Sequence, residues 1–143
     1  MSFVIRDKTA LSGTAYVELQ PGPFDDEFWG DESIYFEEHH WNLLERMLQR
    51  HFPDYDHYGF QTIGKASWVP ILSDFMRLAK KIESGVTVSD IRSEILFGSD
   101  HAEQEFPSEE SKNLNELMNT LKETSQWVTS VLDSGSPVSV LGL

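Results

Sequence analysis

The residues best suited to chemistry in this chain are carboxylates and histidines that lie close together in two short segments. The first segment is Glu37-Glu38-His39-His40. On a helix, Glu37 and His40 share a face, as in one half of a carboxylate-bridged di-metal site. That site needs a second Glu-x-x-His pair, and the other helical segments contain none. His39 and His40 are expected to point about a third of a turn apart. The segment is therefore predicted to be the polar start of an ordinary helix.

The second segment groups His51, Asp54, Asp56 and His57 around a turn. These side chains could chelate a metal loosely, but the H-E-x-x-H spacing of zinc enzymes is absent. Aspartates are also favoured in turns for their backbone geometry. The prediction is a helix end followed by a polar loop. A small metal-dependent enzyme using Glu37, His40, His51 or His57 is the third functional alternative.

Other catalytic motifs do not fit. His101-Ala102-Glu103 matches the H-x-E of zinc deaminases, but their P-C-x-x-C motif is impossible because the chain has no Cys. The chain has no G-x-S-x-G motif, P-loop or Rossmann glycine fingerprint. The sequence predicts a protein that is not an enzyme and uses no cofactor or metal.

An acidic and aromatic stretch, residues 24–38, is the most unusual part of the chain. It places seven carboxylates among six aromatic or branched apolar side chains, without Lys or Arg, in a chain of net charge -13. Such a surface is suited to a basic partner, because complementary charge steers encounter. Glu37 and Glu38 are explained by the dipole of the helix that they begin. The predicted partner-binding residues are Asp25, Asp26, Glu27, Trp29, Asp31, Glu32, Asp54 and Asp56.

Trp29 has two interpretations. It lies between Asp25-Asp26-Glu27 and Asp31-Glu32, where the polarity of its neighbours argues against deep burial. Trp is enriched at interface hot spots, so Trp29 could anchor a partner. Alternatively, Trp29 and Phe28 fold back as a lid on the core. Three other tryptophans lie on or beside helical apolar stripes and are expected in the core: Trp41, Trp68 and Trp127.

Length and composition predict one folded domain, residues 1–143. The hydrophobic fraction of 39% is too high for a disordered acidic tail. The absence of Cys favours the cytoplasm, and the start of the chain does not resemble a signal peptide. The charge of -13 argues against direct binding to nucleic acid or to an anionic membrane.

Hydrophobic periodicity predicts an α+β fold that is mainly helical, with three longer helices and one short helix. A few short strands are predicted in the N-terminal part of the chain, and a β-prone C-terminal tail could pair with an N-terminal strand. The predicted strands are 3–5, 14–19, 34–36, 60–63 and 137–141. The predicted helices are 37–52, 67–84, a short one after Ser89, and a last one from Pro107 to about residue 134. Ser67 is expected to cap the second helix with Pro70 in its first turn, and residues 98–105 are expected to form a loop.

Two parts of the chain, from Phe28-Trp29-Gly30 to Trp68 and the closing Val138-Ser139-Val140-Leu141-Gly142-Leu143, stand out together with small size, acidity and absent Cys. In these features the chain resembles bacterial immunity proteins of contact-dependent inhibition and other polymorphic toxin systems. It implies a cytoplasmic inhibitor that binds a cognate toxin domain, often a basic nuclease, and blocks its active site. It carries over no individual residue. An acidic adaptor or nucleic-acid mimic is the second alternative.

Overall fold

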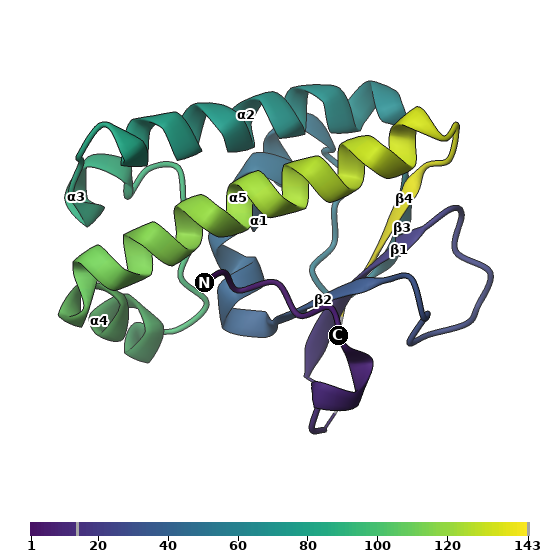
Figure 1. Ribbon diagram of the computed structural model, residues 1–143, viewed down its shortest axis with the longest axis horizontal. Coiled ribbons are helices and arrows are strands. Elements are labelled where there is room, and N and C mark those ends of the chain that lie inside the picture. Colours follow the sequence, from purple (N-terminus) through teal and green to yellow (C-terminus); the bar gives the residue numbers. More distant parts are fainter. Residues whose placement is uncertain (14, 143) are drawn as a thin grey trace.

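Helices cover one face of a four-stranded antiparallel sheet in the computed structural model, which describes residues 1–13 and 15–142 (Figure 1). The strands are β1 (Tyr16–Pro21), β2 (Ile34–Glu37), β3 (Phe60–Ile63) and β4 (Val138–Leu141). The helices are α1 (Glu38–His51), α2 (Lys65–Glu83), α3 (Val88–Ile91), α4 (Asp100–Ser108) and α5 (Glu110–Asp133), with a 3-10 turn at Lys8–Ala10. This arrangement confirms the predicted α+β class.

The sheet has the order β2-β1-β4-β3, so the C-terminal strand lies in its middle. Leu19 of β1 pairs with Val140 of β4 and with Ile34 of β2. The tail therefore pairs with an N-terminal strand, as predicted. Because β4 also pairs with β3, the last residues of the chain hold both halves of the sheet together.

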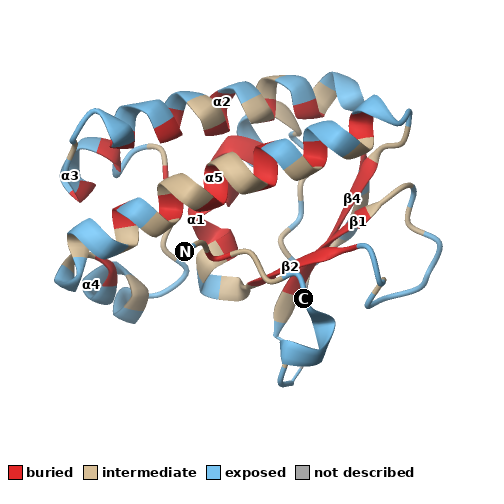
Figure 2. Ribbon diagram, viewed as in Figure 1, coloured by how far each residue is buried: buried red, intermediate tan, exposed pale blue. Residues whose placement is uncertain are grey.

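The main core lies between the sheet and the layer formed by α1, α2 and α5 (Figure 2). Val17 and Leu19 of β1 point into it and are fully buried. On the helices, Trp41 and Trp68 are fully buried, while Trp127 packs partly buried against the same core. Apolar burial on this scale is the main stabilising contribution to such a domain.

The opposite face of the sheet is also covered. Glu18 and Gln20 alternate with the core residues of β1 and therefore point away from the helices, yet they are only 2% and 8% exposed. The cover is the connection from β1 to β2, residues 22–33, here called the acidic loop. This connection is the long loop that extends from the sheet in Figure 1.

Several predicted boundaries are wrong. Residues 3–5 form only one isolated bridge, Ile5 to Tyr35, in place of a strand. Thr14, the first residue of the next predicted strand, lies outside the described residues. Helix α2 begins at Lys65 after Gly64, so Ser67 is not its cap and Pro70 lies beyond its first turn.

The expected loop 98–105 is instead mostly helix α4. Ser99 caps it by accepting a hydrogen bond from the Ala102 backbone N–H at 3.1 Å. Phe106 is the one buried residue of this helix, and its ring lies 5.7 Å from that of Phe97. Pro107 belongs to the end of α4, and α5 starts later, at Glu110. The short helix α3 follows Thr87 rather than Ser89.

Candidate functional site

Glu18 organises the acidic loop from beneath. Its carboxylate accepts hydrogen bonds from the backbone N–H groups of Trp29 at 2.8 Å and Gly30 at 2.9 Å. The Ser33 hydroxyl donates to the same carboxylate at 2.6 Å, and the Gln20 amide donates at 3.2 Å. Hydrogen bonds to a charged acceptor are stronger than neutral ones. One buried carboxylate therefore fixes the middle of the loop.

Further contacts hold the loop backbone in an uncommon conformation. Asp26 and Trp29 have left-handed φ angles of 68° and 60°, a conformation that is uncommon outside glycine. The Gln20 amide donates to the Glu27 carbonyl at 2.9 Å, and the Tyr35 hydroxyl donates to the Gly30 carbonyl at 2.5 Å. Burial, followed by the Glu18 charge, raises the pKa of Tyr35 to about 12, so this hydroxyl stays a donor. The loop is thus preorganised on the sheet.

Trp29 combines features of both sequence interpretations. Its ring stacks on Tyr35 at a centroid distance of 5.7 Å and meets Tyr16 edge-on at 6.5 Å. It therefore folds back on the outer face of the sheet, as a lid would. The residue still keeps 36% of its surface accessible, so part of it is available to a partner.

A second aromatic group lies at the β3 side of the loop. The rings of Phe24, Phe28 and Phe60 are mutually 5.1 to 5.4 Å apart. Phe28 and Phe60 are 47% and 50% exposed, and Tyr58, two residues before Phe60, is 67% exposed. Exposed aromatic side chains gathered in this way are typical of interaction sites.

The loop carboxylates flank Phe28 and Trp29 in the sequence. Asp25, Asp26, Glu27, Asp31 and Glu32 are all exposed. Lys8, from the distant 3-10 turn, donates to Asp31 at 2.5 Å, and this contact lowers the pKa of Asp31. Asp31 is therefore partly neutralised within the chain. The remaining exposed acidic and aromatic residues of this region are together called the acidic-aromatic surface: Asp25, Asp26, Glu27, Phe28, Trp29, Glu32, Tyr58 and Phe60.

Asp54 and Asp56 are exposed in the loop that precedes β3. Asp56 uses its carboxylate to accept from the Tyr58 backbone N–H at 3.0 Å, and its own N–H donates to the Gln61 side chain at 2.8 Å. This is the turn role that the sequence suggested. Because Phe60 packs on Phe24 and Phe28, the 54–59 loop leads directly into the aromatic group of the acidic loop.

The second histidine segment separates into two networks. His51 Nε2 lies 2.7 Å from Asp74, which also accepts from Arg50 and Arg77 at 2.9 and 2.6 Å. Burial alone would raise the pKa of Asp74, but the bonds from Arg77 and His51 outweigh it and lower that pKa. His57 instead points toward α1. The described side chains therefore do not bring His51 and His57 to a common metal site.

His57 lies between two carboxylates. Its Nδ1 is 2.6 Å from Glu45, and its Nε2 is 3.0 Å from Glu38. Tyr55 also donates to Glu45 at 2.5 Å and accepts from the Trp41 indole at 2.8 Å. Burial alone would lower the pKa of His57, but Glu45 and then Glu38 outweigh it and raise that pKa. The network joins the 54–59 loop to α1.

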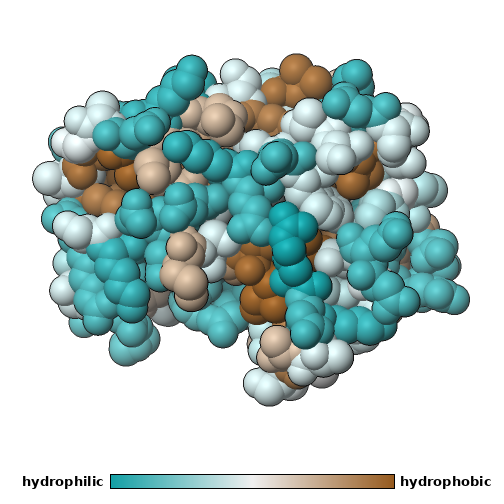
Figure 3. Space-filling model, viewed as in Figure 1, coloured by the Kyte–Doolittle hydropathy of each residue, from teal (hydrophilic) through white to brown (hydrophobic). Residues whose placement is uncertain are grey.

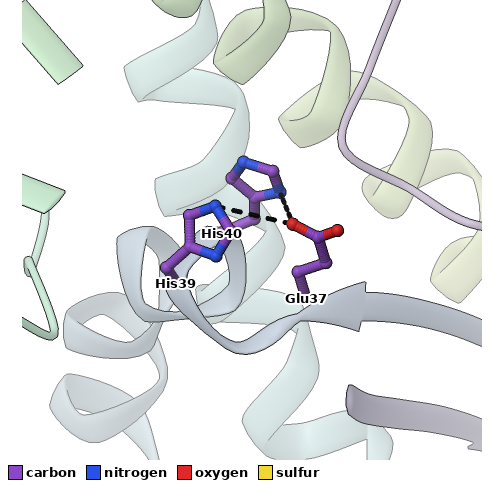
Figure 4. Close-up of side chains that lie close together, drawn as sticks. All are labelled: Glu37, His39 and His40. Atoms are coloured by element: carbon purple, nitrogen blue, oxygen red, sulfur yellow. Dashed lines mark ion pairs between the residues drawn. The ribbon is translucent and has the colours of Figure 1, made fainter. Parts of the chain in front are cut away.

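The first histidine segment converges on one carboxylate (Figure 4). Glu37 Oε2 lies 3.5 Å from His39 Nε2 and 3.7 Å from His40 Nδ1. The two imidazole rings are 3.9 Å apart, so the expectation that they point apart is wrong. His40 also stacks on Phe3 at 3.8 Å. Burial, together with the neighbouring His39, lowers the pKa of His40 to about 4.

The sequence interpretation missed the three buried carboxylates: Glu18, Glu45 and Asp74. Glu18 had a usable signal, because Val17-Glu18-Leu19-Gln20 alternates apolar and polar residues on one strand. Such alternation places Glu18 on the face away from the core. The identity of the loop that covers it has no comparable signal.

Comparison with protein-family models, curated proteins and solved structures finds no match to this chain. Among residues 1–13 and 15–142, no helix has the length and apolar character required to cross a membrane.

Proposed function

We propose that this chain is an immunity-type protein that binds and neutralises a basic toxin domain in the cytoplasm. The observation that carries the proposal is the acidic-aromatic surface, where exposed carboxylates and exposed aromatic rings occur together in and beside a loop fixed by Glu18. Because the loop is already ordered before binding, complex formation costs less conformational entropy than it would with a flexible loop.

The two residue types on this surface have separate roles. The carboxylates of Asp25, Asp26 and Glu27 attract a basic partner and orient it during encounter. Phe28 and Trp29 supply the area that is desolvated in the complex, where most binding energy is concentrated. The net charge of -13 adds long-range attraction, which raises the association rate and weakens as salt increases.

A nuclease domain is the partner class that this surface fits best. Its cleft must be basic because it binds phosphates. An acidic loop that occupies such a cleft prevents the nucleic acid from entering. Hydrophilic residues dominate the view in Figure 3, with smaller hydrophobic groups between them.

A protection assay tests the proposal. Candidate toxin domains of basic charge, taken from genes that neighbour this one, are expressed in bacteria with and without this chain. Growth should be restored only when the chain is present, and the purified pair should co-elute as one complex. An adaptor or nucleic-acid mimic would bind a different protein and leave the toxin active. A small enzyme would have to turn over a substrate, whereas an immunity protein acts by forming a complex. Failure to restore growth, together with absence of a complex, contradicts the proposal.

A further inference from the structure

The cluster of Glu37, His39 and His40 has the composition and spacing of a transition-metal site. One oxygen of Glu37 and one nitrogen from each histidine lie within 4.8 Å of one another. Two histidines and one carboxylate are a common three-residue ligand set for zinc, with bonds of about 2.0–2.2 Å. A tetrahedral ion with such bonds holds its ligands about 3.4 Å apart. The two distances to Glu37, 3.5 and 3.7 Å, are close to this value.

Two of the three side chains, Glu37 and His39, can adjust to complete the geometry. The side chains of Glu37 and His39 are 47% and 54% exposed, so small rotations meet little resistance. Glu37 precedes α1, but its side chain makes no capping hydrogen bond to the helix. His40 is held from below by the Phe3 ring, which fixes one ligand in place. One fixed ligand and two adjustable ones are sufficient to close around a small ion.

The surroundings provide access and attraction. The three residues line a surface cavity of about 490 Å³ that opens between the N-terminal segment, α1, α4 and α5. Glu105, Glu109 and Glu116 also line it, against one basic residue, Lys112. The positive end of the α1 dipole opposes a cation, but the surrounding carboxylates provide a field of the opposite sign. A water molecule in the cavity could occupy the fourth position.

We propose that Glu37, His39 and His40 bind one Zn²⁺ ion, through Glu37 Oε2, His39 Nε2 and His40 Nδ1, with water from the cavity as the fourth ligand. The site departs from the sequence prediction, which expected no metal and expected the two histidines to diverge. It lies on the start of α1 and does not rest on the proposed toxin binding.

Zinc titration of chelator-treated protein by isothermal calorimetry tests the site. Wild-type protein should bind one Zn²⁺ per chain. His39→Ala and Glu37→Gln should each weaken that binding about 100-fold, because loss of even an outer-shell partner costs 10- to 100-fold. His101→Ala is the matched control, since His101 is an exposed histidine that also contacts a glutamate, at 2.9 Å. It should leave the affinity unchanged.

Two further measurements test zinc binding even if a variant folds poorly. Thermal unfolding should shift upward with Zn²⁺ in wild-type protein and in His101→Ala, but not in Glu37→Gln. The imidazole NMR signals of both His39 and His40 should move with one equivalent of Zn²⁺ in wild-type protein. The proposal is overturned if wild-type protein takes up no stoichiometric zinc, if His39→Ala and Glu37→Gln bind as tightly as wild type, or if the signals of His39 and His40 do not respond.

Discussion

Replacing Glu18 with Gln should loosen the acidic loop, because the carboxylate has four donors and no other group replaces it. Gln keeps the size of the side chain but presents one NH₂ group. The least costly orientation turns this NH₂ toward Trp29 and keeps the oxygen near Gly30 and Ser33. The Trp29 N–H then loses its acceptor, and the remaining bonds lose their charge.

The expected cost follows from these contacts. An unsatisfied N–H costs about 1–3 kcal/mol, and converting charge-assisted bonds to neutral ones costs about 0.5 kcal/mol or more each. With three such bonds remaining, the expected loss of unfolding free energy is about 2.5–4.5 kcal/mol. Glu32→Gln is the matched control, since Glu32 is an exposed acid of the same loop. It should change stability by less than about 0.5 kcal/mol.

Urea unfolding measures the stability of both variants, and amide hydrogen exchange locates the change. In Glu18→Gln, the Trp29 and Gly30 amides should exchange much faster, while amides of α2 and α5 lose protection only through the lower global stability. If Glu18→Gln unfolds with the same free energy as Glu32→Gln and its Trp29 amide stays protected, Glu18 does not organise the loop.

Three further predictions concern other buried or crowded positions, and urea unfolding checks each of them. The free energy of unfolding of wild type minus that of His57→Gln should be greatest below pH 6.5 and should decline as the pH rises above it. The reason is that the pKa of His57 is raised in the folded state. Asp74→Asn should cost about 2–4 kcal/mol at pH 7, and the difference should shrink as the pH falls below 3.8, because the pKa of Asp74 is lowered. Gly30→Ala should cost about 1–3 kcal/mol, since its Cβ would lie 2.8 Å from Ser33 Oγ, whereas Gly64→Ala meets nothing within 4 Å and should cost less.

The long helices and the C-terminal strand were predictable because they repeat apolar residues at a regular spacing. Helix α5 has five buried apolar residues at helical intervals, so its existence is clear even though its ends are not: Leu114, Leu117, Leu121, Val128 and Leu132. Helix α4 has only Phe106 buried, so its periodic signal is too weak to separate it from a polar loop. The strand at residues 3–5 was predicted from β-prone residues alone, but pairing is limited to Ile5.

The residue types of the candidate site were predictable from the sequence, but the contacts that hold them in place were not. The local sequence identified the exposed carboxylates and Trp29. It did not identify Glu18, whose partners lie 11 to 15 residues away for the three loop contacts. Lys8 reaches Asp31 across the fold in the same way. Contacts set by strand pairing and loop closure are not encoded in a local pattern.

A comparison of two triple variants tests whether the acidic loop carries partner binding. The loop variant is Asp25→Asn, Asp26→Asn and Glu27→Gln, in which Asn tolerates the left-handed backbone at position 26. The control is Glu83→Gln, Asp100→Asn and Asp133→Asn, which removes three charges from exposed helical positions.

The measurement is the Kd of each variant, at physiological salt, for the basic toxin domain against which the chain protects in the growth assay. Three surface ion pairs at about 0.5–1 kcal/mol each predict a loss of about 10- to 100-fold for the loop variant. The control should lose less than about threefold, through weaker long-range attraction. Equal losses in the two variants, or an unchanged Kd in the loop variant, would show that the acidic loop does not carry partner binding.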